Sequence, residues 1–380
     1  MNRKNMQEDF LDNKLNERIA ESSLRQLRIA DDKIDFFSND YLGMVRNNLV
    51  GKELISGGHQ YADLSHGSTG SRLLSGNYRL IEETEKKITH FHNARAGLIF
   101  NSGYDANLGL LSSASQKGDT ILYDQFSHAS IRDGIRLSFA QSFPFLHNDL
   151  GDLEKKLDRG SQNIFIVTES VFSMDGDMAP LEEMARLSEK YKARLIVDEA
   201  HATGVIGPGG EGLVQELGLE EKCFARIHTF GKAVGCHGAI VLGSELLIRY
   251  LINFSKPFIY TTALPQTAIK SLNLAYSIFP GLNEERKKIR QLISQYRKST
   301  AMPDRNVDRG KPIDSITPIQ GYLIPDNNRL KALSGKLAEA GLDVRPILYP
   351  SVARGSERLR IILHSYNTER ELSSLLSQLW

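Results

Sequence analysis

The chain has 380 residues, of which 41% are hydrophobic and 24% are charged, and its formal net charge at neutral pH is +1. These values are ordinary for a globular protein of two or three packed units, and the near-zero charge gives no general attraction to nucleic acid or anionic lipid. The two cysteines, Cys223 and Cys236, lack a metal-ligand spacing, so we expect no disulfide framework and a reducing, cytoplasmic location.

The start of the chain lacks the apolar core of a signal peptide, and we find no run of about 18 apolar residues that would suggest a membrane span. Residues 8–30 instead show helical spacing through Phe10, Ile19 and Leu24, with charges between them. We therefore expect an N-terminal helical arm within residues 1–45.

The middle of the chain alternates short apolar runs with amphipathic segments. The runs are AGLIF (96–100), TILYD (120–124), NIFIVTES (163–170), RLIVD (194–198), ARIHTF (225–230) and GAIVLG (238–243). Continuous apolar strands separated by helices predict a mostly parallel sheet that helices cover on both faces. We expect this α/β domain to span residues 46–275, with ligands at the carboxyl ends of its strands.

The pattern changes from about residue 276. A strongly charged segment at 284–298 predicts a helix with a solvated face, and a polar stretch, PDRNVDRGKPIDS (303–315), follows it. Strand-like and helical segments then alternate to the C-terminus. We therefore expect a separate, smaller α+β domain at residues 276–380.

The run VDEAHATGVIG (197–207) contains the letters D-E-A-H, which also mark an acidic strand end in some helicases. An NTPase of that kind needs an upstream phosphate-binding loop of the form G-x-x-x-x-G-K-[ST]. Neither of the two Gly-Lys pairs, at 51–52 and 231–232, fits, because no Ser or Thr follows either pair. The sequence therefore argues against an NTPase.

Candidate site residues lie at or just after the ends of five of the expected strands, at the edge where a parallel sheet collects ligands. They are Gly103, His128, Ser173, Asp198 with His201, and Thr229 with Lys232. A helix that opens at a glycine suits a phosphate, a deprotonated lysine bonds to an aldehyde, and an aspartate keeps a pyridine nitrogen protonated. These residues predict a site for pyridoxal 5′-phosphate and require no metal.

The same residues lie in motifs that resemble the α-oxoamine synthases, a branch of the fold-type-I pyridoxal-phosphate enzymes. The motifs are FSNDYLG (37–43), HGSTGSRLLSG (66–76), NSGYDAN (101–107), SHAS (127–130), HND (147–149), TESVFSMDGDMAPL (168–181), VDEAHATGVIG (197–207), HTFGKAVG (228–235), IYTTALP (259–265) and ERLR (357–360). The resemblance runs from about residue 8 to the C-terminus. It implies an aspartate-aminotransferase-like fold, with a mostly parallel sheet between helices in a large domain.

The resemblance also implies a role for each residue of the cofactor site. Lys232 matches the lysine that bonds to the cofactor, Asp198 the partner of the pyridine nitrogen, and His201 the partner of the ring oxygen. His128 matches the histidine that stacks on the ring. These four are the expected catalytic residues. The other expected cofactor contacts are Gly103, Tyr104, Ser173 and Thr229.

Substrate and partner contacts are implied in the same way. Arg360 matches the arginine that pairs with an amino-acid carboxylate, for which a guanidinium is suited. The remaining contacts are Arg25, Asn39 and Ser351 for substrate, and Thr261 and Thr262 from a partner subunit. The resemblance therefore implies a homodimer with shared active sites.

Within the family, the chain most resembles the 8-amino-7-oxononanoate synthases of biotin biosynthesis. That resemblance implies decarboxylative condensation of L-alanine with a pimeloyl thioester, carried on coenzyme A or on an acyl carrier protein. Glu199 departs from it by standing where Asp is frequent, and the segment RPILYPSVARG is longer than its match, with Ala353 in place of a common Pro. DGIRLS (133–138) resembles the 2-amino-3-ketobutyrate CoA ligases. The alternatives are therefore a glycine C-acetyltransferase of that branch, another acyltransferase that uses serine or glycine, and a homologue that binds the cofactor without catalysis.

Overall fold

The computed structural model describes residues 8–27, 29, 32–58, 63–159, 163–301 and 310–379. The chain forms two compact units. The larger unit comprises residues 39–173 and 177–287, and the smaller one comprises the described residues up to Ser38, Met174–Gly176 and those from Lys288 onward. The sequence predicted three segments, with boundaries near residues 45 and 275. That three-part division stays a prediction.

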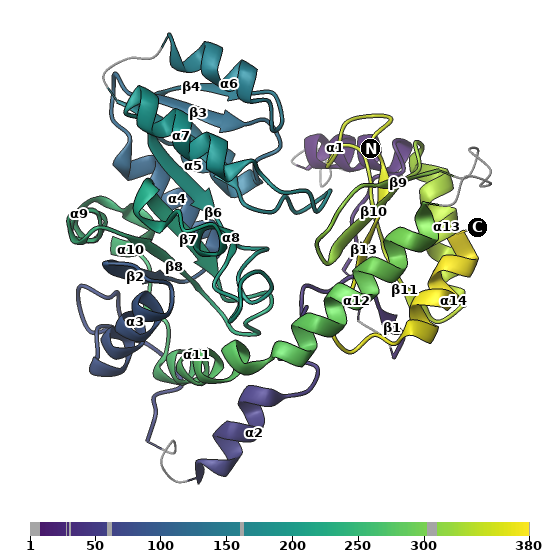
Figure 1. The fold of residues 1–380 in the computed structure, drawn as a ribbon, viewed down its shortest axis with the longest axis horizontal. Coiled ribbons are helices and arrows are strands. Elements are labelled where there is room, and N and C mark those ends of the chain that lie inside the picture. The colour runs from purple at the N-terminus through teal and green to yellow at the C-terminus, as the bar shows by residue number, and fades with distance from the viewer. Residues whose placement is uncertain are drawn as a thin grey trace. The chain divides into compact units, whose positions relative to one another are not determined.

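A sheet forms the centre of the larger unit (Figure 1), and it consists of seven strands. In spatial order its strands are β2 (Ala96–Phe100), β8 (Ala239–Gly243), β7 (Cys223–Thr229), β6 (Arg194–Asp198), β5 (Ile164–Glu169), β3 (Thr120–Asp124) and β4 (Gln141–Phe145). β3, β4, β5, β6 and β7 pair in parallel, and β8 is antiparallel to both of its neighbours. The mostly parallel sheet expected from the sequence is therefore confirmed.

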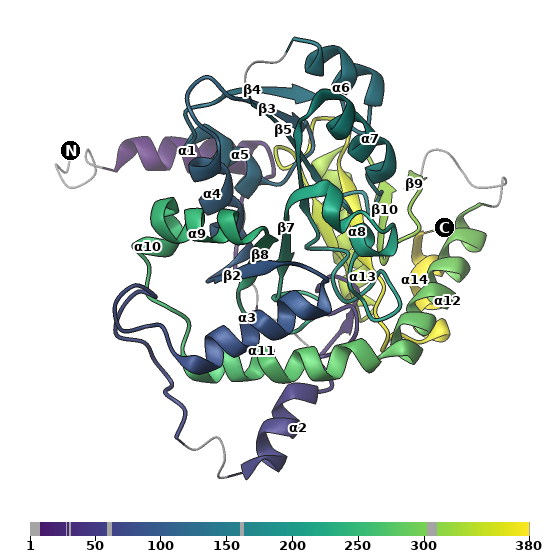
Figure 2. The same ribbon diagram turned by 60° about the vertical axis from the view of Figure 1, so that its left-hand side comes forward.

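Burial on both faces of this sheet explains why its strands are continuous apolar runs. All six residues of β5 are buried. Val167, Ile196 and Ile227 belong to one large apolar core, which also contains residues of α4 (Gly103–Ala114), α5 (Ala129–Arg136) and α9 (Glu245–Phe254). Helices flank the sheet, as the two views in Figure 1 and Figure 2 show.

The other helices of the larger unit lie before, between and after its strands in the sequence. They are α2 (Leu49–Ser56), α3 (Arg79–Phe91), α6 (Leu150–Leu157), α7 (Leu181–Tyr191), α8 (Leu213–Glu216), α10 (Lys256–Ile259) and α11 (Gln266–Ile278), with 3₁₀ turns at Glu220–Lys222 and Phe279–Gly281. Within the described ranges, we find no helix with the length and apolar character that crossing a membrane requires.

The sequence prediction missed strand β4, at the end of the sheet. Its first four residues, including Pro144, are exposed, and only Phe145 is buried. Proline is tolerated on an edge strand because its missing N–H group costs no ladder hydrogen bond there. An exposed edge strand therefore lacks the apolar run by which the other strands were found.

The smaller unit holds an antiparallel sheet, which agrees with the α+β domain expected from the C-terminal pattern. Its strands, in spatial order, are β12 (Arg345–Ile347), β13 (Arg358–Ile362), β10 (Ile319–Leu323) and β9 (Lys311–Ile313), and a parallel pair is formed by β1 (Ile34–Asp35) and β11 (Leu342–Asp343). Its helices are α1 (Asp9–Ala20), α13 (Asn327–Glu339), α14 (Glu369–Leu379) and the part of α12 (Asn283–Thr300) from Lys288 onward.

The extent of the N-terminal helix differs from the sequence expectation. The arm was expected to be helical over residues 8–30, but α1 ends at Ala20 and Ser22 takes a positive φ of 53°. The apolar spacing that suggested a longer helix is solvent-facing, since no residue of α1 is buried and Phe10 is 65% exposed. The polar stretch after α12, for which the sequence suggested no strand, contains β9.

Candidate active site

The carboxyl ends of three neighbouring parallel strands bring the central residues of the candidate site together. Glu169 at the end of β5 pairs in register with Asp198 at the end of β6, and Asp198 pairs with Ile227 of β7. Thr229 is the last residue of β7, and Lys232 follows three residues later. The sequence expectation that these strand ends meet at one edge is borne out by this register.

Asp198 is buried, with 6% of its surface exposed, and accepts hydrogen bonds on both carboxyl oxygens. Its Oδ1 accepts from the Ala200 N–H at 2.9 Å, and its Oδ2 accepts from Asn107 Nδ2 at 2.7 Å. The same amide of Asn107 donates to Ser130 Oγ at 3.1 Å. A carboxylate offers about four acceptor positions, so Asp198 retains capacity for a further N–H donor.

His128 is the N-cap residue of α5, and its ring is fixed by Ser130. Nδ1 lies 2.8 Å from Ser130 Oγ and accepts from the Ser130 N–H at 3.2 Å. Burial lowers the pKa of His128; the charge of Asp198 opposes that change and the charge of Lys232 adds to it. The imidazole is therefore neutral. It is buried on one side and reaches solvent at the strand edge, as a ring that stacks on a flat ligand requires.

Lys232 is half-buried in the turn after β7. Burial is the main cause that raises the pKa of Glu169 to about 8, the charge of Asp198 raises it further, and the charge of Lys232 opposes it. The same two charges act on His128. These shared effects place the amine, both carboxyls and the imidazole in one electrostatic neighbourhood.

The N-terminus of α4 forms an anion cradle at the same edge. Ser102 caps this helix by accepting the Asp105 N–H at 3.1 Å, and Gly103 is its first residue. A Cβ placed on Gly103 would stand 3.3 Å from Oγ1 of Thr229, so glycine leaves space in front of that hydroxyl. Free N–H groups, the helix dipole and a hydroxyl together suit a phosphate.

His201 is oriented by a tyrosine that the sequence prediction did not include. Tyr41, which is fully buried, lies with its hydroxyl 2.7 Å from His201 Nδ1. The same hydroxyl donates to Asn39 Oδ1 at 3.3 Å, so it accepts from the imidazole Nδ1–H. Asn39, an expected substrate contact, is thereby linked to His201.

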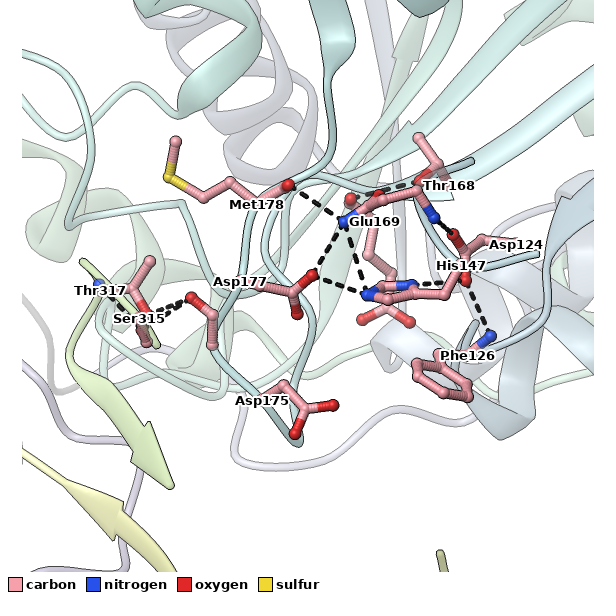
Figure 3. Close-up of polar contacts among 12 residues, drawn as sticks. Asp124, Phe126, His147, Thr168, Glu169, Asp175, Asp177, Met178, Ser315 and Thr317 are labelled. Carbon is pink, nitrogen blue, oxygen red and sulfur yellow. Dashed lines mark hydrogen bonds and ion pairs between the residues drawn. The ribbon is translucent and has the colours of Figure 1, made fainter. Parts of the chain in front are cut away.

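Ser173 is half-buried in the loop after β5. His147 contacts Asp177 at the other end of that loop. His147 Nδ1 lies 2.9 Å from Asp124 Oδ1, and Nε2 lies 2.6 Å from Asp177 Oδ2 (Figure 3). The ring packs edge-on against Phe172, with centroids 4.4 Å apart. Through His147, the HND motif therefore packs against Phe172, the residue before Ser173. The sequence analysis had assigned this motif no role.

Three further expected site residues lie on the surface of the larger unit or near it. Tyr104 is 41% exposed, and its hydroxyl donates to Asp133. Asn101 Nδ2 donates to Thr261 Oγ1 at 3.0 Å and to the Thr262 carbonyl at 2.9 Å. Within one chain, the two threonines thus adjoin the turn that opens α4.

The remaining expected substrate contacts belong to the smaller unit. Arg25 Nη2 donates to Ser351 Oγ at 2.8 Å, so two residues 326 positions apart in the sequence meet. Arg360 is half-buried in the middle of β13. Because these residues lie outside the larger unit, their roles remain a proposal.

Sequence reasoning missed Glu169, Asn107, Ser130 and Tyr41. Each lies inside a motif quoted above, but no pattern marks its partner. Asn107 follows Gly103 by four residues, on the same side of a helix, and this spacing could have suggested that it faces the site. Ser130 follows His128 by two, which is a common spacing for a local side-chain hydrogen bond.

Comparison with known proteins agrees with this geometry. The family described as aminotransferase class I and II matches residues 31–379. An 8-amino-7-oxononanoate synthase of Emericella nidulans is 40% identical over 361 residues, which cover 90% of this chain and 87% of that protein.

Two solved structures extend the comparison. A serine palmitoyltransferase of Sphingomonas wittichii gives a TM-score of 0.86 at 28% identity, covering 100% of this chain and 97% of that one. An 8-amino-7-oxononanoate synthase of Francisella tularensis gives a TM-score of 0.78 at 29% identity, covering 92% and 97%. The expected fold is thus confirmed over nearly the whole chain.

Proposed function

Because the chain belongs to the class I and II aminotransferase family and is a pyridoxal-phosphate-dependent acyltransferase of the 8-amino-7-oxononanoate synthase type, we propose that it condenses L-alanine with a pimeloyl thioester. The products are 8-amino-7-oxononanoate, CO₂ and the free thiol of coenzyme A or of an acyl carrier protein. The observation that carries the proposal is the 40% identity to a relative of that name over 361 residues.

The residues at the strand edge fit pyridoxal phosphate. The space in front of Thr229 that Gly103 leaves open accepts a phosphate at the start of α4. The spare acceptor capacity of Asp198 suits a pyridinium N–H, and the exposed, neutral ring of His128 suits stacking. Lys232 supplies the amine for covalent attachment.

When bound, pyridoxal phosphate supplies an electron sink for the electron pair that forms at the Cα of the amino acid. Lys232 would hold the cofactor, and its amine would accept and return the Cα proton. Asp198 would offer its buried negative charge to a pyridinium N–H, and Asn107 and Ala200 hold that carboxylate in place. Because these groups are fixed before the substrate arrives, little reorganisation is needed during the reaction.

Substrate contacts are proposed for the residues that match the family's motifs. Arg360 pairs with the amino-acid carboxylate, and Asn39 contacts the substrate beside His201. Arg25 and Ser351, which hydrogen-bond to each other, contact the acyl thioester. We further propose a cytoplasmic homodimer in which each subunit lends Thr261 and Thr262 to the other.

A serine-using acyltransferase is the second candidate. The observation that favours it is the higher TM-score of the serine palmitoyltransferase, 0.86 against 0.78 for the Francisella tularensis protein. Full-length sequence identity favours the alanine-using reaction instead, because it reaches 40%.

A matrix of substrates tests the proposal. L-alanine, glycine and L-serine are each combined with pimeloyl-CoA, acetyl-CoA and palmitoyl-CoA. Thiol release is measured with a colorimetric thiol reagent, and the products are identified by mass spectrometry. We expect L-alanine with pimeloyl-CoA to give the highest kcat/KM. A higher value for glycine with acetyl-CoA, or for L-serine with palmitoyl-CoA, would overturn the substrate assignment. The discrimination between alanine and glycine rests on one methyl group, worth about 1–3 kcal/mol.

Lys232→Ala tests the role of this lysine in cofactor attachment and in turnover. We expect this variant to lose the visible absorption of the bound cofactor and all turnover. Lys117→Ala, which removes an exposed lysine from a surface turn, is the matched control and should retain both. Turnover by the first variant would contradict the role of the lysine.

A further inference from the structure

The segment that follows β13 holds a fully buried histidine, His364, to which the cofactor and substrate assignments give no role. It lies just after the strand that carries Arg360, the residue proposed for the amino-acid carboxylate. It belongs to the smaller unit, as does the segment 34–38, which leads along the chain into Asn39. His364 is therefore close in the chain to one proposed substrate contact, and its hydrogen bonds reach the other.

The segment 34–38 is bonded to the end of β13 and to the turn after it. The Ile362 N–H donates to the Phe36 carbonyl at 2.8 Å. Asn367, which is buried, donates from Nδ2 to the Asp35 carbonyl at 3.1 Å. These two bonds leave the last carbonyl of the segment to be held by a side chain.

That last carbonyl belongs to the peptide group between Ser38 and Asn39. His364 Nε2 lies 2.9 Å from the Ser38 carbonyl oxygen and 3.2 Å from Ser38 Oγ. A carbonyl oxygen only accepts hydrogen bonds, so Nε2 of His364 carries a proton. The imidazole thus holds the peptide group at which Asn39 begins.

The other ring nitrogen of His364 also carries a proton, because two backbone groups fix the orientation of Asn367. Asn367 Oδ1 accepts the His364 N–H at 2.9 Å, and its Nδ2 donates to the Asp35 carbonyl. A flipped amide would set donor against donor and acceptor against acceptor. His364 Nδ1 therefore meets an amide oxygen, at 3.0 Å, and an amide oxygen only accepts. With a proton on each nitrogen, His364 is an imidazolium.

The surroundings of His364 suit a positive charge. The ring of Tyr366 stacks on the imidazole, with centroids 4.6 Å apart and planes at 8°, and an aromatic face attracts a cation. The Tyr366 hydroxyl donates to Asp35 Oδ2 at 2.8 Å. Burial acts to raise the pKa of Asp35, but the charge of His364 and local hydrogen bonds, chiefly from Ser38, outweigh burial and lower that pKa. The imidazolium thus has a carboxylate as its counter-charge.

The neighbouring strands add one further ion pair. Asp343 of β11 pairs in register with Asp35, and Arg345 donates to Asp343 Oδ2 at 2.7 Å. Arg345 also lies over the ring of Phe37, 4.6 Å from its centroid, and pairs in register with Arg360. Because Asp343 and Arg345 offset each other, Asp35 is left to balance the imidazolium.

We propose that His364 is a positioning residue for the amino-acid substrate and acts as a buried imidazolium. Its Nε2–H holds the Ser38 carbonyl, and its Nδ1–H holds Asn367. Together these bonds fix the backbone at the start of Asn39 and join it to the end of the strand that carries Arg360. The inference rests on the substrate roles proposed above for Asn39 and Arg360.

Nitrogen-15 NMR of the holoenzyme, labelled at histidine, reads the protonation of His364 directly. The two ring resonances are assigned by their loss in His364→Gln. We expect both ring nitrogens to show the chemical shift of a protonated nitrogen at pH 7. An unprotonated ring nitrogen on His364 would overturn the proposal, whichever substrates the enzyme uses.

Steady-state kinetics tests the positioning, with the amino acid that the substrate matrix selects. His364→Phe keeps a flat ring but has no donor, so we expect KM for the amino acid to rise about tenfold, the change that loss of one hydrogen bond produces. We expect kcat and the cofactor absorption to stay at the wild-type level. His364→Gln keeps an N–H near the position of Nε2 and should restore most of the affinity. His90→Gln, at an exposed histidine of α3, is the matched control.

Arg360→Lys distinguishes failure of this inference from failure of the proposed substrate site. If KM rises in Arg360→Lys but not in His364→Phe, the role of His364 is wrong and the proposed site stands. If KM rises in neither variant, both are wrong. A fall in kcat or a loss of cofactor in His364→Phe as large as the rise in KM would indicate a merely structural histidine and would also refute the proposal.

Discussion

Replacement of His147 by Gln tests how charge holds the loop that carries Ser173. Burial alone would lower the pKa of His147, but hydrogen bonds and charges from Asp124 and Asp177 outweigh it and raise the pKa to about 9 (Figure 3). The side chain is only 18% exposed, so solvent screens these charges weakly. A rise from 6.5 to about 9 corresponds to about 3 kcal/mol of stability, as an order of magnitude.

The sign of this effect gives a pH-dependent prediction. A group whose pKa is raised on folding contributes fully below its unfolded value of 6.5, and the contribution is lost as the pH rises through 9. We therefore expect His147→Gln to lower the free energy of unfolding by about 3 kcal/mol at pH 6 and by much less at pH 10. Urea unfolding of the holoenzyme, followed by circular dichroism at both pH values, measures this difference. An equal loss at pH 6 and pH 10 would refute the charge-based reasoning.

Three further perturbations act on other parts of the larger unit. Asp198→Asn keeps the size of the side chain but removes its charge, so we expect kcat to fall by about 10²–10³-fold with the cofactor still bound, as shown by absorbance and steady-state assays. Gly212→Ala places a methyl group 1.8 Å from Glu199 Oε2 at a φ of +114°, so we expect a loss of more than about 2 kcal/mol of stability, seen as a lower melting temperature. The pKa of Glu169 is raised to about 8. Its contribution to stability is therefore complete below pH 4.5 and is lost as the pH rises through 8. Glu169→Gln cannot ionise, so we expect it to flatten the decline in unfolding free energy between pH 6 and 9.

The strands of the larger unit could be predicted because burial on both faces leaves a direct mark on the sequence. β5 and β6 are continuous apolar runs, and each begins and ends within one residue of its predicted bounds. β4 and β9 carry no such mark, since β4 is an exposed edge strand with Pro144 and β9 is three residues long in a polar segment. Strands of that kind are fixed by the neighbour they pair with, which sequence spacing does not reveal.

The site could be predicted as far as its residues lie at strand ends. Asp198 and Thr229 were found because parallel strands deliver their last residues to one edge. The residues that orient Asp198 and His201 were missed because they act across long separations in sequence: 91 positions between Asn107 and Asp198, and 160 between Tyr41 and His201. Asparagine and tyrosine are common on surfaces, so their presence in a motif does not indicate which distant group they hold.

The letters D-E-A-H illustrate how one segment serves two faces of a sheet. Asp198 points to the cofactor edge, and because side chains alternate, Glu199 must point behind it. Burial there raises the pKa of Glu199 to about 7, although the Val214 N–H and the charge of Arg226 oppose that change. The same alternation in β7 turns Thr229 toward the cofactor and His228 toward Glu199. Adjacent letters of one motif therefore lie on opposite faces of the sheet, and strand register decides which of them faces the site.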